Sequence, residues 1–351
     1  MTSPLSPETL FALLAPDAGG MLELVRTAPE RGRAHLDLGR SQPWHQTRLP
    51  AQILICGMGG SGSAGDLFQA SCRQARIPLI VAKTAQLPAW VGPETLVIGI
   101  SYSGNTFETL SCLRQAGQAG ASLLGLASGG ELAEMAARQG FPLLRIAGGL
   151  PPRAALFEML FALLGCLQGL PALGLDPAEI DAGLARLDTL SRDWEPKAHH
   201  PQPLPLTLAR SLADNRVDTP LLWGVTGATD AIALRWKNQF SENAKTLAAV
   251  SLLPELNHNE VVAMCARHHS QQRLIYLTLE TAMPAADVVV LDLVRPHLHE
   301  VTALTAPEGR RLERLLYFVY LGDFCSVYLA LLTGVDPTPI AAIDELKRRM
   351  A

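Results

Sequence analysis

The sequence predicts an α/β protein with two doubly wound lobes, each a mainly parallel sheet flanked by helices. Three observations support this prediction. Apolar runs of strand length alternate with helical patterns in the first half of the chain, and the same alternation returns in the second half. The length of 351 residues also exceeds what one hydrophobic core usually serves. We therefore expect an internal repeat of architecture rather than of sequence.

The first lobe is expected over residues 51–195. Five apolar runs predict its strands: QILICG, PLIVA, TLVIGI, SLLGLA and PLLRIA, each separated from the next by enough chain for a crossover helix. The segment RAALFEMLFALLGCLQGL is apolar almost all round, which predicts a buried helix that closes the lobe. The pattern weakens between about 171 and 206, where the proline-rich stretch DWEPKAHHPQPLPL predicts an ordered linker.

The second lobe is expected over residues 196–351. Its predicted strands are LLWGV, AAVSLLPEL, RLIYLTL and DVVVLDL, with a helix from Ala231 to Lys245 after the first of them. A long helical region from about 308 to 333 and a final helix, PIAAIDELKRRM, complete the chain. Residues 1–50 are predicted to form a helical extension that packs on the lobes, with SPETL as a helix start.

Composition narrows the class of protein. The formal charge is −4 and no stretch concentrates Lys and Arg, so we expect no nucleic-acid partner. The six cysteines form no CxxC pair and most lie in apolar segments, which favours a reducing compartment. The first residues lack a basic region followed by an apolar core and a cleavage site, and no window holds 18 uninterrupted apolar residues. These features predict a soluble cytoplasmic protein with no membrane contact.

Two hydroxyl-rich turns follow predicted strands and precede predicted helices. They are GGSGSAGD, which begins at Gly59, and SYSGNT, which begins at Ser101. A helix start exposes unpaired N–H groups and the positive end of the dipole, so added hydroxyls there suit an anion with several oxygens. The alternative for each turn is a purely structural role, as a strand-to-helix connection capped by Ser or Thr. Two such turns in succession favour a phosphomonoester on a small organic body, bound by Gly60, Ser61, Ser63, Ser101, Ser103, Gly104 and Thr106.

A dinucleotide site is the competing interpretation of the first turn. Residues 57–62, GMGGSG, match the glycine pattern G-x-G-x-x-G and follow a predicted strand. A Rossmann site also needs an acidic residue about 20 positions further on, yet the strand PLIVAKTAQ offers only Lys83. Lys83 could favour a 2′-phosphate, so an NADP-binding oxidoreductase stays as an alternative.

The two turns together resemble the sugar isomerase (SIS) fold, whose members bind sugar phosphates through an S-x-S-G-x-T loop. Four further matches resemble one branch, the bifunctional phosphoglucose/phosphomannose isomerases: Arg153 in GGLPPRAALFEML, Glu242 in RWKNQFSENAK, His258 in LPELNHNE and Lys347 in the last helix. The resemblance runs from about residue 50 to the C-terminus. ENAK followed by PELNHNE at this spacing is the most specific part, because no general structural demand requires it.

The resemblance implies an isomerase of glucose 6-phosphate and mannose 6-phosphate that forms fructose 6-phosphate through an enediol. Glu242 is then the base that moves a proton between C1 and C2, and His258 with Lys347 opens the sugar ring. Arg153 is the cation that stabilises the enediolate. Taken singly, each has a structural alternative: a surface ion pair for Glu242, a packing role for His258, a solvated surface for Lys347 and a charge at a helix start for Arg153.

The same resemblance implies a homodimer in which His258 is contributed across the interface. No cofactor and no metal are expected: the H-x-H-E cluster of His297, His299 and Glu300 fits no common zinc pattern and reads as a polar lead into the helix after residue 300. A non-catalytic SIS sensor of sugar phosphates is the alternative function. An amino-sugar synthase is disfavoured because a glutaminase half and a nucleophilic N-terminal Cys are absent from the sequence.

Overall fold

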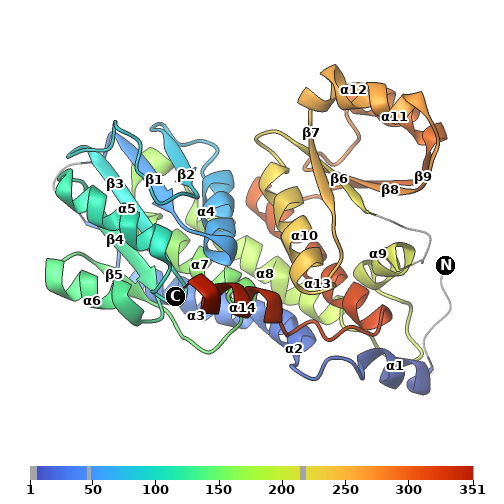
Figure 1. The fold of residues 1–351 in the computed structure, drawn as a ribbon, viewed down its shortest axis with the longest axis horizontal. Helices are drawn as coiled ribbons and strands as arrows, with labels where there is room; N and C mark the ends of the chain where they lie inside the picture. The colour runs from blue at the N-terminus through green and yellow to red at the C-terminus, as the bar shows by residue number, and fades with distance from the viewer. Residues whose placement is uncertain (1–5, 46–48, 214–218, 351) are drawn as a thin grey trace. The chain divides into compact units, whose positions relative to one another are not determined.

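The computed structural model describes residues 6–45, 49–213 and 219–350, and the chain forms two compact units (Figure 1). The first unit is residues 27–188, and the second unit combines residues 1–26 with residues 189–351. The structure thus divides the chain at Thr189 where the sequence suggested 195, and it shares the expected 1–50 extension between both units. Helix α3 (Ala28–Ser41) packs along α7 (Leu156–Leu167) of the first unit, whereas α2 (Met21–Arg26) packs on α13 (Arg311–Leu332) of the second.

The first unit contains a parallel sheet of five strands in the order β2-β1-β3-β4-β5. The strands are β1 (Gln52–Cys56), β2 (Leu79–Ala82), β3 (Thr95–Ile100), β4 (Ser122–Ala127) and β5 (Leu143–Arg145). Every pairing is parallel, and β3 is buried along its whole length. The five predicted strands are confirmed, because continuous apolar runs are what a sheet covered on both faces requires.

The helices of the first unit cover both faces of this sheet. Helix α5 packs on β3 and β4, α6 packs on β4 and β5, and α4 packs on β2 and on α7. Because crossovers between parallel strands are right-handed, the reversal of strand order after β1 places α4 opposite α5 and α6. These helices are α4 (Gly59–Ser71), α5 (Phe107–Gln118) and α6 (Gly130–Gln139).

Strand order reverses between β1 and β3, which are neighbours in the sheet although β2 lies between them in the chain. At such a point the connections that leave the two strands run to opposite faces, and a crevice opens outside the strands' carboxyl ends. The turns after β1 and β3 are the two hydroxyl-rich turns of the sequence. Topology therefore brings both predicted phosphate-binding turns to one edge of one sheet.

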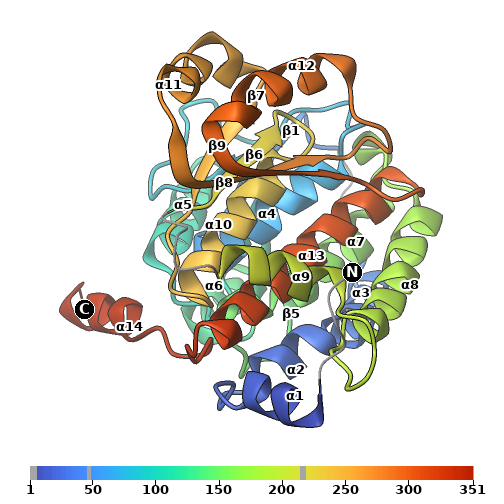
Figure 2. The same ribbon diagram turned by 90° about the vertical axis from the view of Figure 1, so that its right-hand side faces the viewer.

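The second unit contains a parallel sheet of four strands in the order β7-β6-β8-β9. The strands are β6 (Leu221–Val225), β7 (Ala249–Leu253), β8 (His269–Thr278) and β9 (Leu298–Thr305). Helices α11 and α12 lie on one side of this sheet and α10 and α13 on the other (Figure 2). Helices α1 and α9 pack on α13. These helices are α1 (Pro7–Leu14), α9 (Leu204–Leu212), α10 (Asp230–Glu242), α11 (Glu260–Ala266) and α12 (Ala285–Val294).

Three sequence-based predictions of secondary structure are wrong. The run DVVVLDL lies in α12, a helix in which Leu291 and Val294 are buried and Val289 is exposed, so its apolar residues follow helical spacing on the sheet. The last strand is β9, over residues read as a polar lead into a helix. Helix α8 (Pro177–Asp193) occupies much of the stretch read as weakly patterned.

The long helix predicted for about 308 to 333 is confirmed as α13. Within the described residues it is the one helix long and apolar enough to cross a membrane, with 89% of its most apolar window buried inside the protein. Trp236 Nε1 donates a hydrogen bond to its Phe318 carbonyl, and Tyr328 donates to the Trp194 carbonyl. Such burial is what the core helix of a globular unit shows.

Candidate functional site

The SYSGNT turn after β3 is organised by its own hydroxyls. Ser101 Oγ donates to Thr106 Oγ1 at 2.9 Å and accepts from the Thr106 N–H at 3.2 Å, so the two ends of the turn are bonded to each other. Ser103 is exposed, and its Oγ accepts from the Asn105 N–H. Helix α5 then begins at Phe107, and no side chain caps its first turn. The turn therefore presents a helix start beside hydroxyls, as an anion site requires.

Gly104 gives this turn its shape. Its φ is +75°, and a Cβ there would lie 1.8 Å from the Gly129 carbonyl oxygen. Its N–H donates to the Ser101 carbonyl and its carbonyl accepts from the Leu132 N–H, which fixes the turn against the start of α6. Only glycine combines this conformation with such a close approach of two backbones.

The first turn is bonded to the second through Ser61. This side chain is buried, and its Oγ accepts from the Tyr102 N–H at 3.1 Å and contacts Met159 Sδ at 3.6 Å. Ser61 thus joins the two turns in this structure, and its contact with a phosphate stays a prediction. Gly60 is the other predicted residue here: a Cβ on it would lie 2.7 Å from the Pro152 carbonyl oxygen, so the first turn touches the segment that carries Arg153.

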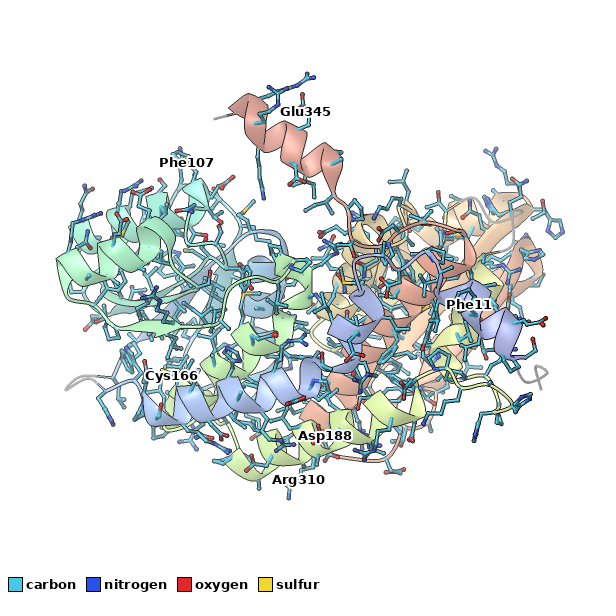
Figure 3. All side chains as sticks on the ribbon, turned by 90° about the horizontal axis from the view of Figure 1, so that it is seen from below. Phe11, Phe107, Cys166, Asp188, Arg310 and Glu345 are labelled. Atoms are coloured by element: carbon cyan, nitrogen blue, oxygen red, sulfur yellow. The ribbon has the colours of Figure 1, made fainter. Side chains whose placement is uncertain are left out.

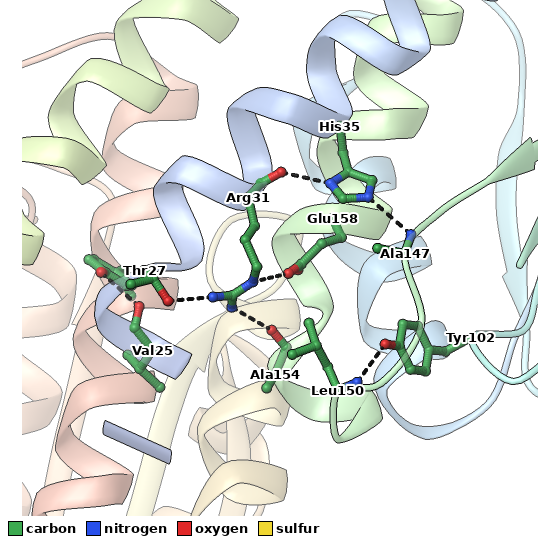
Figure 4. A network of polar contacts seen from close by, with 10 residues as sticks. Val25, Thr27, Arg31, His35, Tyr102, Ala147, Leu150, Ala154 and Glu158 are labelled. Carbon is green, nitrogen blue, oxygen red and sulfur yellow. Dashed lines mark hydrogen bonds and ion pairs between the residues drawn. The ribbon is translucent and has the colours of Figure 1, made fainter. Parts of the chain in front are cut away.

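Arg153 lies in a short 3₁₀ turn, η1 (Pro152–Ala154), just before α7. It is 2% exposed, an unusual position for a guanidinium. Contacts on both sides hold the segment: the Leu150 N–H donates to the Tyr102 hydroxyl at 2.8 Å, and Arg31 Nη2 lies 3.5 Å from the Ala154 carbonyl oxygen (Figure 4). The structure therefore brings Arg153 and both hydroxyl-rich turns together in the first unit.

The side chains that hold this segment come from α3 and α7. Arg31 forms an ion pair with Glu158, whose carboxylate is fully buried, and also donates to Thr27 Oγ1. His35 contacts the Arg31 carbonyl through Nδ1 at 2.7 Å, and its Nε2 faces the Ala147 N–H at 3.4 Å (Figure 4). With Nδ1 donating to a carbonyl, Nε2 is the acceptor, which is the neutral tautomer.

Lys83 is the residue on which the alternative of an NADP-binding site depends, and its side chain forms an ion pair within the first unit. Its Nζ pairs with Asp66 of α4 at 2.5 Å. The pair ties the end of β2 to α4, and it gives this lysine a structural role within the first unit.

Glu242 is the last residue of α10 in the second unit and is half-buried. The turn that follows is held by Lys245, which has φ +54° and whose Nζ donates to the carbonyls of Glu242, Asp336 and Pro337 at 2.9–3.0 Å. Lys245 therefore binds the end of α10 to the segment after α13. A ladder of buried polar contacts also joins α10 to α13, from Gln239 to Asp323 and from Asn243 to Ser326.

His258 ends the 3₁₀ turn η3 (Glu255–His258), and its side chain is exposed. It follows β7, whose end pairs with the end of β6, so it lies at the carboxyl edge of the second sheet. Helix α10 starts at that edge and runs back about 18 Å, so that Glu242 lies near the opposite edge, where β7 begins. Within the second unit, Glu242 and His258 lie at opposite edges of the sheet.

Lys347 lies on α14 (Ala341–Met350), which projects from the second unit after α13 (Figure 3). The described side chains of this helix are mostly exposed, including the apolar Ile343 and Leu346. Its neighbours Arg348 and Arg349 pair with Glu345 on the same helix. The structure therefore places Lys347 on a solvent-exposed helix.

That His297, His299 and Glu300 bind no metal stays a prediction. Their secondary structure, however, differs from the polar lead into a helix that we expected. His297 ends a short 3₁₀ turn, and the other two lie in β9. Arg273 of β8 contacts both Glu300 and His299 Nε2. Among the described residues no three His, Cys, Asp or Glu side chains gather to hold a metal ion.

Sequence reasoning missed the residues that support Arg153, namely Tyr102, Arg31, His35 and Glu158. Tyr102 is the second residue of SYSGNT, but the prediction of an anion site depended on the Ser and Thr hydroxyls around it. Burial raises the pKa of the Tyr102 phenol, which keeps it neutral. Arg31 and His35 lie in the N-terminal segment to which no motif was assigned, and no local signal marks them.

Comparisons with known proteins bear on the fold and the family of this chain. Residues 204–350 match a family model described as the bacterial phospho-glucose isomerase C-terminal SIS domain. A crystal structure of a hypothetical protein from Thermus thermophilus is similar in fold, with a TM-score of 0.68 at 17% identity over 97% of this chain and 93% of that one. The fold and the paired turns define an SIS-fold protein of the phosphosugar isomerase class.

Two relatives at higher identity show the family. A bifunctional phosphoglucose/phosphomannose isomerase of Caldicellulosiruptor bescii is 33% identical over 94% of this chain and 99% of its own length. One of Aquifex aeolicus is also 33% identical, over 85% of this chain and 90% of its own length. The chain belongs to the bifunctional phosphoglucose/phosphomannose isomerase family, as its motifs predicted.

Proposed function

We propose that this protein interconverts glucose 6-phosphate and mannose 6-phosphate with fructose 6-phosphate through a cis-enediol, without a metal ion. The observation that most supports this proposal is in the first unit, where Ser101, Thr106 and Gly104 shape the turn after β3 and the buried Arg153 lies in a segment bonded to that turn. Membership of the family supports the substrates, since its curated relatives are named for both isomerisations. A dinucleotide role finds no support, because Lys83 is paired with Asp66.

The proposed chemistry assigns one task to each predicted residue. His258 and Lys347 transfer protons that open the hemiacetal, and Glu242 then takes the C2 proton of the aldose and returns it to C1. Negative charge develops on the enediolate oxygens, and the Arg153 guanidinium stabilises it in a site with little water. Both C2 epimers give the same enediol, so one base serves both aldoses after rotation about C2–C3.

We also propose a homodimer that shares its sites, and the positions of Glu242 and His258 in the second unit support it. Glu242 and His258 of one chain lie near opposite edges of one sheet, so a site that uses both takes them from two copies. The helices after His258 also expose apolar side chains, with Val262 74% and Val289 68% exposed. Val262 lies on α11, four residues after His258, and Val289 lies on α12, which packs on α11; a second copy would cover such exposed apolar side chains.

The cysteines support a proposal about the compartment of the protein. Five of the six are buried free thiols, which favours the reducing cytoplasm.

The proposal is tested by assaying purified protein in EDTA, with no nucleotide, for fructose 6-phosphate formed from each aldose. Glu242→Gln keeps the shape of the side chain and should lower kcat about 10²–10⁴-fold, while inorganic phosphate still inhibits or binds. Glu134→Gln on α6, an exposed residue in a surface ion pair with Arg138, is the matched control and should be unchanged. Retained turnover in Glu242→Gln would remove that residue from its role. Binding without turnover in the wild-type protein would indicate a sugar-phosphate sensor.

A further inference from the structure

Tyr102 makes contacts to three separate segments of the first unit. Its N–H donates to Ser61 Oγ in the turn after β1, and its carbonyl accepts from Ser128 N–H at 2.9 Å and Ser128 Oγ at 2.7 Å in the turn after β4. Its hydroxyl accepts from the Leu150 N–H at 2.8 Å. The side chain is 6% exposed, so these contacts are made away from bulk water. Tyr102 is itself the second residue of SYSGNT, so the phosphate-binding turn is the fourth segment at this junction.

The contact to Leu150 fixes the direction of the chain toward Arg153. Two prolines, Pro151 and Pro152, lie between these residues, and the pyrrolidine ring locks φ near −65° in each. The turn then closes on itself, with the Ala154 N–H donating to the Pro151 carbonyl at 2.8 Å. A stiff link of two prolines therefore joins the anchored N–H of Leu150 to Arg153.

Two other contacts hold the same turn. Arg31 Nη2 meets the Ala154 carbonyl oxygen, and Arg31 is itself set by its ion pair with the buried Glu158. Pro152 touches Gly60 of the first turn. The hydroxyl of Tyr102 differs from both, because among these contacts it alone comes from the SYSGNT turn that the phosphate would occupy.

We propose that Tyr102 is a positioning residue for catalysis: its hydroxyl sets the place of the Arg153 guanidinium relative to the phosphate-binding turn. The distance between a bound phosphate and the stabilising cation is thereby fixed by one side chain that belongs to the phosphate turn. This inference rests on the proposed function, which assigns Arg153 to the enediolate. The Tyr102 hydroxyl is engaged by the Leu150 N–H, so in this proposal it acts through the Arg153 segment and not on the substrate.

The position of the cation affects the transition state more than the ground state. The phosphate is present in substrate and transition state alike, so binding by the turn is uniform. The negative charge of the enediolate is absent from the substrate and develops in the transition state that leads to this intermediate. Loss of the Tyr102 hydroxyl should therefore lower kcat and spare phosphate affinity. A merely structural tyrosine would instead lower stability and leave the ratio of kcat to phosphate affinity unchanged.

The test is Tyr102→Phe, which keeps the ring and removes the acceptor for the Leu150 N–H. Tyr328→Phe is the matched control, since it removes a buried hydroxyl that bonds a backbone carbonyl of the second unit. We measure kcat and KM for fructose 6-phosphate, the inhibition constant of inorganic phosphate, and the affinity for a phosphorylated hydroxamate that mimics the enediolate. Hydrogen exchange of the peptide around residues 147–155 reports the freed N–H directly.

For Tyr102→Phe we expect kcat and hydroxamate affinity to fall about tenfold or more, the phosphate inhibition constant to stay within about twofold, and exchange at 147–155 to accelerate. For Tyr328→Phe all four should stay near wild type. Equal losses of phosphate and hydroxamate affinity, or unchanged hydroxamate affinity, would overturn the positioning role. If the wild-type protein lacks turnover, the proposed function fails, yet the two affinities and the exchange rates still decide the role of Tyr102.

Discussion

Helices α3 and α7 touch backbone to backbone, and adding one methyl group at that contact should be costly. A Cβ on Gly165 of α7 would lie 2.4 Å from the Leu36 carbonyl oxygen and 2.9 Å from the Arg40 nitrogen of α3. Across the contact, a Cβ on Gly39 would lie 2.2 Å from the Ala162 carbonyl oxygen. Glycine on both helices therefore permits the close packing, and Gly165→Ala is the perturbation.

The size of the effect follows from these distances. A carbon and an oxygen need at least about 3.0 Å, so the helices must separate locally by about 0.6 Å. Neither atom belongs to a side chain that could rotate away, and overpacking of this kind costs about 1–3 kcal/mol. Alanine recovers up to about 1 kcal/mol of helix propensity. We expect a net loss of about 1 kcal/mol, and no more than about 2 kcal/mol, in the free energy of unfolding.

Gly117 of α5 offers the same substitution without the clash. It is exposed, and the nearest atom to its Cβ position is Gln139 Oε1 at 3.5 Å, an ordinary contact. Gly117→Ala should therefore stabilise by about 0.5–1 kcal/mol through propensity alone. In thermal unfolding followed by far-UV circular dichroism, at about 2–4 °C per kcal/mol, Gly165→Ala should melt about 2–4 °C lower and Gly117→Ala slightly higher than wild type.

The activity of the same variant extends the prediction to the site. Helices α3 and α7 carry Arg31 and Glu158, the ion pair beside the Arg153 turn, so separating the helices should also lower kcat. The Gly117→Ala control should keep wild-type kcat. A Gly165→Ala protein that melts at or above the wild-type temperature would refute the close packing and, with it, the expected effect on the site.

Three further predictions concern single residues. Gly104→Ala should lose phosphate affinity and at least about 1–2 kcal/mol of stability, measured by calorimetry and melting, because φ is +75° and the Gly129 carbonyl blocks a Cβ. Asn243→Leu should cost about 1–3 kcal/mol in urea unfolding, since it leaves the buried Ser326 hydroxyl without the amide that donates to it. A thiol reagent at pH 8 should modify the half-buried Cys265 before the buried Cys72. Burial raises the pKa of the Cys72 thiol to about 12, so this thiol stays neutral in the folded state. The raised pKa of Cys72 also contributes to the free energy of unfolding, and this contribution is complete below pH 9 and is lost as pH rises toward 12.

The strands of the first unit could be predicted because a parallel sheet covered on both faces demands continuous apolar runs. The same signal is misleading at α12, where DVVVLDL looks like a buried strand in isolation. Only the sheet beneath it shows that Leu291 and Val294 form the packed face of a helix. Strand β9 was missed for the opposite reason, since only its first residue, Leu298, is buried and polar residues interrupt the run. A short apolar run carries no record of the layer that covers it.

The candidate site also has parts that could be predicted from the sequence and parts that could not. Ser101 and Thr106 could be selected from residue type and position, and Arg153 from the resemblance to a family. The contacts that join them are made largely to backbone groups: the Tyr102 N–H, the Leu150 N–H and the Ala154 carbonyl. Every residue except proline carries both an N–H and a carbonyl group, so the pattern of residue types does not predict which backbone groups form these contacts.

The fold decides which backbone groups are used, and this explains how Arg153 can be held in a buried turn. Strand order reverses between β1 and β3, which places their two turns at one edge, and α4 packs on α7, which carries the Arg153 turn to the same place. Burying a guanidinium is costly unless fixed polar groups surround it. A turn with Tyr102 on one side and Arg31 on the other supplies that fixed geometry, so in the proposed reaction the Arg153 cation would need little reorganisation when charge develops on the substrate.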